Sequence, residues 1–305
     1  MLPMLVVVVL TAVWGYTFVP VKEAVALYPV LAFLGVRFLI ASGVLGLVAL
    51  PRLRRLPRDG WALGVAVGLL LGASLALQTA GLQRTTVSST GFITGLYVVL
   101  TPLFGLILFR HRIGLVGWIG TGVSILGLGL IAGAPGGGLV GDLLVLASCL
   151  TQALQILFLG RWAGRYDGLA LTFVEVAACT VGLLMVAGAL GELHLPHGAV
   201  VWRGLLITAI PATALALFAQ IWVQQRIPAA RAAILFTLEV PFAALFGIVL
   251  QGDSLGTWGW LGGALIAVAI VIVEPAATQW LRSASGRRAA RLRRPARSSR
   301  PSAGP

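Results

Sequence analysis

The feature of this sequence that most constrains its fold is a series of apolar segments, each about as long as a membrane-spanning helix. A helix needs about 20 mainly apolar residues to cross the hydrocarbon layer of a bilayer. Sheets are poor alternatives, because an open sheet leaves unpaired backbone groups in lipid. The segments cover residues 3–21, 30–50, 61–81, 87–108, 115–133, 141–160, 169–190, 204–223, 229–250 and 257–274. The sequence therefore predicts an all-α membrane protein of about ten transmembrane helices.

The composition excludes a water-soluble domain. Hydrophobic residues make up 59% of the chain and charged residues 10%, whereas a soluble domain carries about 25% charged residues. The net charge of +13 does not indicate a nucleic-acid partner. The positive residues lie in short loops and in a C-terminal tail, and not on one face of a folded domain.

The distribution of arginine predicts the orientation in the membrane. Loops that follow even-numbered segments are rich in arginine, and so is the tail after the tenth. These residues are Arg52, Arg54, Arg55, Arg58, Arg110, Arg112, Arg161, Arg165, Arg226, Arg231 and those from Arg282 to Arg300. The other side has only Lys22, Arg84 and Arg203. Because cytoplasmic loops carry the excess of positive residues, both termini are expected in the cytoplasm.

The second half of the chain resembles the first half at an offset of about 142 positions. Without a gap over about 55 residues, this offset aligns Gln78 with Gln220, Gln83-Arg84 with Gln225-Arg226, and Gly117-Trp118 with Gly259-Trp260. Each repeat has five spans, and an odd number forces the two repeats into opposite orientations. Inverted repeats of this kind are typical of secondary transporters that work by alternating access.

The repeat predicts the domain organisation. We expect a first five-helix repeat over residues 3–133, a glycine-rich linker over 134–140 and a second repeat over 141–275. The remaining residues, 276–305, are rich in Arg, Ser, Ala, Gly and Pro, and have almost nothing to bury. They are expected to be disordered in the cytoplasm. Their arginines would be a solvated topology anchor or would contact anionic lipid headgroups.

Three ionisable residues lie inside predicted spans, where a charge is costly and therefore indicates function. Arg37 and Glu175 occupy similar places in the second spans of the two repeats. They would form an ion pair that positions helices, or bind a substrate or a proton. Glu239 lies two residues before Pro241, and proline bends a helix and frees a carbonyl group. Because burial favours the protonated form of a carboxylate, Glu239 could carry a proton.

Aromatic and amide side chains within the spans could complete a cavity. Trp14, Tyr97, Gln152 and Gln155 are the main candidates for the binding of a polar solute. Gln78 and Gln220 are of the same kind. Each of these residues could instead join two helices by a hydrogen bond or anchor a helix at the interface.

No motif indicates an enzyme, a cofactor or a metal. The chain has no Walker A motif, no strand that could carry a dinucleotide-binding loop, and no Ser, His and Asp set suited to hydrolysis. Cys149 and Cys179 lie in apolar segments, and neither belongs to a Cys/His cluster. The pair His194 and His197 is a weak metal signal. We therefore predict no enzymatic activity, no cofactor and no metal.

Several motifs resemble the EamA-type transporters of the drug/metabolite transporter superfamily. They are Trp14-Gly15-x-x-Phe18-x-x-x-Lys22, Arg37-Phe38, Thr94-Gly95-Leu96-Tyr97 followed by Pro102, and Leu238-Glu239 followed by Pro241-Phe242. The resemblance covers about residues 5–275. It implies ten spans in two repeats and the export of metabolites such as amino acids, or of toxic compounds, without an organic cofactor.

The sequence also departs from the pattern of that family. Arg110-His111-Arg112 and Gln251-Gly252-Asp253 stand where the family often has Gly-Glu. Val240 separates the glutamate from the proline of the usual Glu-Pro pair, and Thr151-Gln152 stands where an aromatic residue is common. The identity of the solute therefore does not transfer from any one relative.

Taken together, the sequence predicts a secondary active transporter of small amino acid-like or drug-like solutes, coupled to a proton or another solute and working as an exporter by alternating access. Its site would contain Glu239, Glu175, Arg37, Trp14, Tyr97, Gln152 and Gln155. The alternative is a membrane scaffold or partner subunit that transports nothing. We expect a multi-pass protein of a bacterial inner or plasma membrane, and a homodimer is an open alternative to a monomer.

Overall fold

The computed structural model describes residues 2–84, 90, 93–110, 114–132, 139–251, 257–258, 260–269 and 272, and within these ranges every regular element is helical. The first half contains α1 (Leu2–Val25), α2 (Val30–Leu53), α3 (Arg58–Leu82), α5 (Tyr97–Phe109) and α6 (Leu115–Ala132). The second half contains α7 (Leu139–Trp162), η1 (Ala163–Arg165), α8 (Gly168–Ala189), α9 (Ala199–Ala209), η2 (Ile210–Leu215), α10 (Ala216–Gln224), α11 (Ala229–Phe236) and α12 (Glu239–Gln251). The last described helix is Trp260–Ala269.

Each of the ten predicted spans contains a described helix, which confirms the all-α prediction. Six helices are long and apolar enough to cross a membrane, and the last of these joins α9, η2 and α10 over Ala199–Gln224. Helix α1 continues to Val25, beyond the predicted end at 21. Hydropathy marks where the apolar stretch ends, but backbone hydrogen bonds can continue through polar residues such as Lys22 and Glu23.

The outer surface of the bundle is apolar. Large side chains such as Leu47 on α2, Leu126 on α6 and Met185 on α8 are each more than 60% exposed. Exposed apolar side chains on this scale would be unfavourable in water but suit contact with lipid tails. Residues 134–138 of the predicted linker, residues 276–305 of the predicted tail, and Glu274 lie outside the described residues.

Close contacts of two glycines show that α2 and α8 run in opposite directions. Gly35 and Gly46 of α2 face Leu184 and Phe173 of α8 respectively. Residue numbers rise along one helix as they fall along the other, so α2 and α8 are antiparallel. Small residues let helix backbones approach each other closely where lipid offers no hydrophobic driving force between helices.

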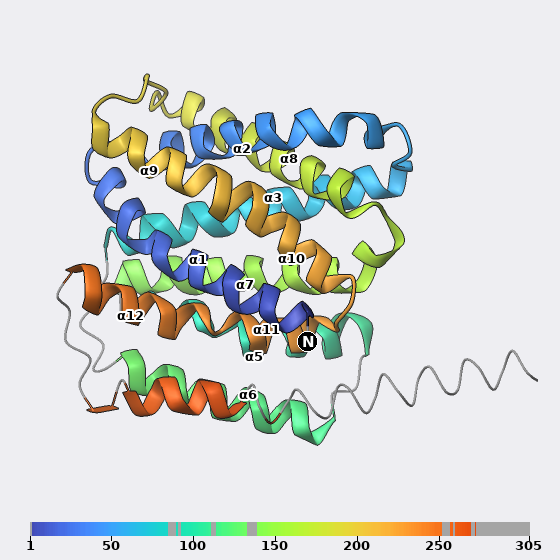
Figure 1. Ribbon diagram of the computed structural model, residues 1–305, viewed down its shortest axis with the longest axis vertical. Helices are drawn as coiled ribbons and strands as arrows, with labels where there is room; N and C mark the ends of the chain where they lie inside the picture. The colour runs from blue at the N-terminus through green and yellow to red at the C-terminus, as the bar shows by residue number, and fades with distance from the viewer. Residues whose placement is uncertain are drawn as a thin grey trace, which may run out of the picture.

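The later helices of the two halves follow the same 142-residue register as the sequence, whereas α7 ends 137 residues after α1, and α8 begins 138 residues after α2. Helices α5 and α12 are offset by 142 residues at both ends. The end of α10 at Gln224 lies 142 residues after the end of α3 at Leu82. Helix α6 lies beside the last described helix at one edge of the bundle (Figure 1), and a Cβ atom on Gly127 would come within 2.7 Å of the Gly262 carbonyl oxygen.

Three of the predicted spans are not continuous α-helices. The ninth span is divided into α11 and α12 by a turn at Thr237 and Leu238, and the fourth is interrupted at Leu96 just before α5. The eighth contains the six-residue π-helix η2, where Pro211 has no N–H to donate. The predicted spans 87–108 and 229–250 therefore each contain a turn. Hydropathy measures how apolar a segment is, not whether its backbone hydrogen bonds are continuous.

We expect Gly68→Ala to weaken the packing of α3 against α8. A Cβ atom at this position would lie 2.3 Å from the Glu175 carbonyl oxygen and 2.9 Å from the Ala178 Cβ. Overpacking of this kind costs about 1–3 kcal/mol, so the unfolding temperature in detergent should fall. Gly43→Ala is the matched control, since it lies in α2 with nothing within 4 Å of its Cβ position. Equal unfolding temperatures for the two variants would contradict the close packing.

Candidate functional site

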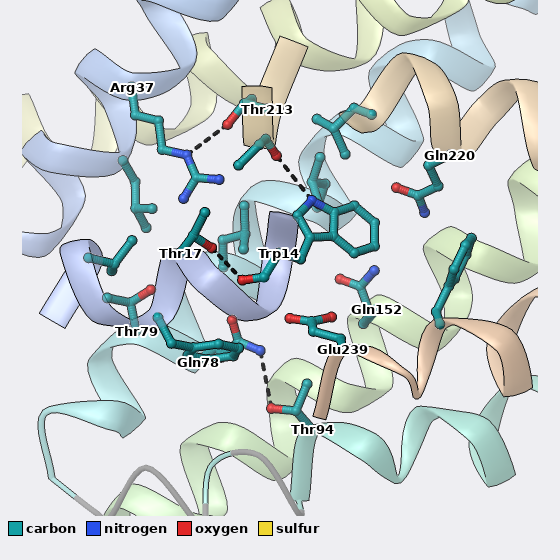
Figure 2. Close-up of a pocket in the computed structure, with 18 of the residues that line it drawn as sticks. Trp14, Thr17, Arg37, Gln78, Thr79, Thr94, Gln152, Thr213, Gln220 and Glu239 are labelled. Atoms are coloured by element: carbon teal, nitrogen blue, oxygen red, sulfur yellow. Dashed lines mark hydrogen bonds between the residues drawn. The ribbon is translucent and has the colours of Figure 1, made fainter. Parts of the chain in front are cut away.

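A cavity lies in the middle of the bundle, between helices of both halves (Figure 2). Its volume is about 100 Å³, of the same order as an engineered protein cavity of about 150 Å³ that binds benzene. In this conformation it has room for a small solute. Its polar and amphipathic lining residues are Trp14, Thr17, Arg37, Gln78, Thr79, Thr94, Tyr97, Gln152, Thr213, Gln220 and Glu239.

The two halves contribute equivalent positions to the cavity wall. At an offset of 142 residues, lining residues of the first half coincide with lining residues of the second. The pairs are Leu71 and Thr213, Leu75 and Leu217, Gln78 and Gln220, Thr94 and Phe236, and Tyr97 and Glu239. The cavity therefore lies on the boundary between the two halves, and neither half could form it alone.

Glu239 is the acidic group of the cavity wall. It is the first residue of α12, directly after the turn that divides the ninth span. In Figure 2 its carboxylate lies among the side chains of Trp14, Gln78 and Gln152. Among the described residues no hydrogen bond or ion pair reaches this carboxylate. The group is therefore available to a cation, a proton or a solute.

Arg37 is the basic group of the cavity wall, and the π-helix holds it. Its Nε donates a hydrogen bond of 2.7 Å to the Thr213 hydroxyl. The Trp14 Nε1 donates to the Ala212 carbonyl oxygen, 3.0 Å away in the same π-helix. The irregular backbone of η2 thus orients both an arginine and an indole at the cavity. A guanidinium has five N–H donors, so the bond to Thr213 leaves others for a carboxylate.

Five of the seven predicted site residues line the cavity, namely Trp14, Arg37, Tyr97, Gln152 and Glu239. The other two lie behind its wall. Glu175 is completely buried, and its Oε1 accepts a hydrogen bond of 2.7 Å from the Gln155 Nε2. The Gln155 Oε1 in turn accepts from Gln220, at 3.2 Å, and from Gln152, at 3.4 Å.

The ion pair between Arg37 and Glu175 that the sequence left open is not formed. Both side chains are described, and each has a different partner: Thr213 for Arg37 and Gln155 for Glu175. Similar positions along two repeat-related helices do not require that the side chains point at each other. Here α2 directs its arginine toward η2, whereas α8 directs its glutamate toward α7.

Sequence reasoning missed the threonines of the cavity wall, of which Thr213 and Thr94 have the clearest contacts. Thr213 accepts from Arg37, and Thr94 accepts from the Gln78 Nε2 at 3.1 Å. Threonine is common in membrane helices and often bonds to its own backbone, so its type alone carries little information. Pro211 could have drawn attention to Thr213, because a proline inside a span disturbs the backbone around it.

The cavity extends toward one end of the bundle. It reaches Val21, Leu34 and Leu82, which lie near the end of α1, the start of α2 and the end of α3. At the opposite end the Gln225 Nε2 donates to the Ala163 and Tyr166 carbonyl oxygens, each 3.1 Å away.

A related bond occurs in the first half of the chain. Gln83 lies 142 positions before Gln225, and its Nε2 donates to the Val25 carbonyl oxygen at 3.3 Å. In each half, therefore, a glutamine after the third span bonds to backbone near the end of the first. These two contacts lie at opposite ends of the bundle.

Comparison with protein families gives one match that covers nearly the whole chain. The EamA-like transporter family matches residues 1–133 and again residues 139–274. Two matches to one family in a single chain indicate an internal repeat.

Individual relatives carry transporter names. The chain is 30% identical over 263 residues to an uncharacterized transporter of Archaeoglobus fulgidus, covering 86% of this chain and 82% of that protein. It is 26% identical over 272 residues to the uncharacterized inner membrane transporter YedA of Escherichia coli, covering 86% and 87% of the two chains. A solved crystal structure superposes with a TM-score of 0.75 at 17% identity, over 91% of this chain and 98% of that one. At this identity the last comparison supports the fold alone.

We predict that a cysteine in place of Gln78 reacts with a water-soluble thiol reagent in detergent solution. Gln78 lines the cavity, whereas the native Cys149 and Cys179 are both buried and should remain unmodified. The control is Ala41→Cys, at a fully buried position of α2. Mass spectrometry of the intact protein counts the added groups. Labelling of Ala41→Cys as fast as Gln78→Cys would show that the cavity is not a distinct water-accessible space.

Proposed function

The chain belongs to the EamA-like transporter family, a family of membrane transporters and not of enzymes, and on that premise we propose a specific mode of transport. The protein is a secondary active transporter that moves a small amino acid-like or drug-like solute by alternating access. It is coupled to a proton or to a second solute and works as an exporter. The multi-pass bundle with a central cavity supports this proposal.

The observation that carries the proposal is the composition of the cavity wall from repeat-related pairs. If each half adopts the conformation that the other half has here, equivalent residues again form the cavity wall. The bundle then has two conformations of similar energy. The antiparallel arrangement of α2 and α8 supports an inverted relation between the halves, because these are the second helices of their repeats. The proposed domain limits are 3–133 and 141–275, joined by 134–140 and followed by the cytoplasmic tail 276–305.

The charges of the cavity favour a small zwitterion as the solute. Arg37 offers a cation and Glu239 an anion, and they come from different halves of the chain. A zwitterion that bridges them would have its carboxylate at Arg37 and its ammonium group at Glu239. The indole of Trp14 offers an aromatic surface for an apolar or cationic part of the solute.

The proposed orientation makes this conformation face outward. With the arginine-rich loops in the cytoplasm, the end at which Gln225 bonds to the loop after α7 is cytoplasmic, and the end reached by Val21, Leu34 and Leu82 is external. The opposite state would break the contacts of Gln225 and close the cavity near Gln83. We further propose that the tail contacts anionic lipid headgroups. The assembly, as a monomer or a homodimer, does not alter this cycle, since both halves of the cavity come from one chain.

Transport in proteoliposomes tests the proposal directly. A pooled metabolite library is loaded or presented, and flux is followed by mass spectrometry with and without a pH gradient. We expect Glu239→Gln to lower the initial rate about tenfold or more, because a hydrogen bond to a charged group contributes about 1.5–3 kcal/mol. Glu192→Gln, between α8 and α9 and away from the cavity lining, should retain the wild-type rate.

The possible outcomes separate the functions. Flux that ignores both Glu239 and the gradient would remove the coupling role of Glu239 but retain the transporter. No flux of any solute by correctly inserted wild-type protein would favour the scaffold or partner subunit.

The orientation has its own test. A fluorescent protein fused to the C-terminus should be fluorescent in Escherichia coli, because it would fold in the cytoplasm. Alkaline phosphatase fused within residues 191–198, between α8 and α9, should be active because that loop would be external. The reverse pattern would overturn the proposed N-in/C-in topology.

A further inference from the structure

A buried carboxylate lies behind the cavity wall and does not line the cavity. Glu175 has no exposed surface, and its Oε1 has a single donor, the Gln155 amide. Its Oε2 has no hydrogen-bond partner. Among the described residues no cation forms an ion pair with it. An ionised carboxylate is very costly in such a place unless it is paired, so this site is suited to the binding of a proton.

A chain of amide groups connects this carboxylate with the cavity. The Gln220 Nε2 donates to the Gln155 Oε1, and the Gln155 Nε2 donates to the Glu175 Oε1. Gln152 also donates to Gln155, and accepts at its own Oε1 from the Ser74 hydroxyl at 3.1 Å. Gln152 and Gln220 line the cavity. The Gln220 amide thus donates toward Gln155, and the Gln155 amide donates toward Glu175. A charge on the Glu175 carboxylate would therefore orient both amides.

We propose that Glu175 is a proton-binding site behind the solute cavity that acts on the cavity through Gln155. The inference rests on the proposed function. It assigns a different role to each of two carboxylates: Glu239 faces the solute, and Glu175 binds the coupling proton. Protonation forms one O–H bond at Oε2, the oxygen without a partner, and breaks one O–H bond of a hydronium ion, which becomes water. Oε1 continues to accept from Gln155.

Protonation would alter the cavity wall without any contact between proton and solute. An ionised Glu175 holds the Gln155 N–H group toward itself and the Gln155 carbonyl toward Gln220. A neutral Glu175 holds this amide less strongly, so the amide can turn and change which groups Gln220 and Gln152 offer to a solute. Within the part of the chain that the structure describes, the other titratable and charged groups facing this region are Cys179, on the next turn of α8, and Arg37 on α2, and Cys179 interacts electrostatically with both Glu175 and Arg37.

Infrared spectroscopy of the purified full chain tests the site without any solute. The probe is the proton itself: spectra at acidic and alkaline pH are subtracted, in a detergent without ester groups, and the C=O band of protonated carboxyl groups is compared among variants. We expect Glu175→Gln to remove a component of this band that Glu239→Gln and Glu192→Gln both leave in place. A carboxyl band that is unchanged by Glu175→Gln would overturn the proposal.

A second variant keeps the test decisive if Glu175→Gln does not fold. Gln155→Leu removes the one donor to Oε1, so the same component should move to higher frequency, as expected for a carbonyl group that loses a hydrogen bond. An unshifted band would contradict the link through Gln155. Because neither measurement needs transport, failure to find a solute would count against the proposed function and not against this site.

Discussion

The structure depends on one constraint, which is that lipid cannot hydrogen-bond to a polar group. The long helices satisfy it by bonding their backbones internally and exposing apolar side chains such as Leu47 and Met185. Wherever a polar side chain or an unbonded backbone group lies inside the bundle, its hydrogen bonds must come from other protein groups or from water in a cavity. Here the departures gather in one place: the π-helix η2, the break between α11 and α12, Arg37 and Glu239 all meet at the central cavity. The cavity is where the bundle can accept irregular backbone and charge.

The two halves resemble each other in packing but differ in polarity. Pairs such as Tyr97 with Glu239 and Gln78 with Gln220 put both halves on the same wall. At other positions the halves diverge, so that Leu71 of the first half corresponds to Thr213 of the second. The shared positions suit an exchange of conformation between the halves, whereas the differences can distinguish solute from proton. Similar packing with different chemistry therefore supports the proposed coupling of a solute to a proton.

Much of the fold could be predicted from the sequence because hydropathy and charge in a membrane protein follow directly from the solvent. Each of the ten predicted segments contains a described helix, and the repeat register predicted from Gln78 and Gln220 reappears in α5 and α12. The side-chain directions could not be predicted. Arg37 and Glu175 have similar places in their repeats but bond to Thr213 and Gln155, because rotation of each helix about its axis is set by packing. The π-helix could not be predicted either, since one proline does not specify which hydrogen bonds its neighbours adopt.

The central claim is that one cavity between the two halves opens alternately to each side of the membrane. The most direct measurement is the sidedness of labelling of Leu75→Cys, a cavity-wall position on α3. A membrane-impermeant thiol reagent is applied to right-side-out vesicles and, separately, to inside-out vesicles. The account predicts labelling from both sides, faster from the outside because the cavity extends to that end in this conformation. Labelling from one side only, under conditions of solute flux, would contradict alternating access.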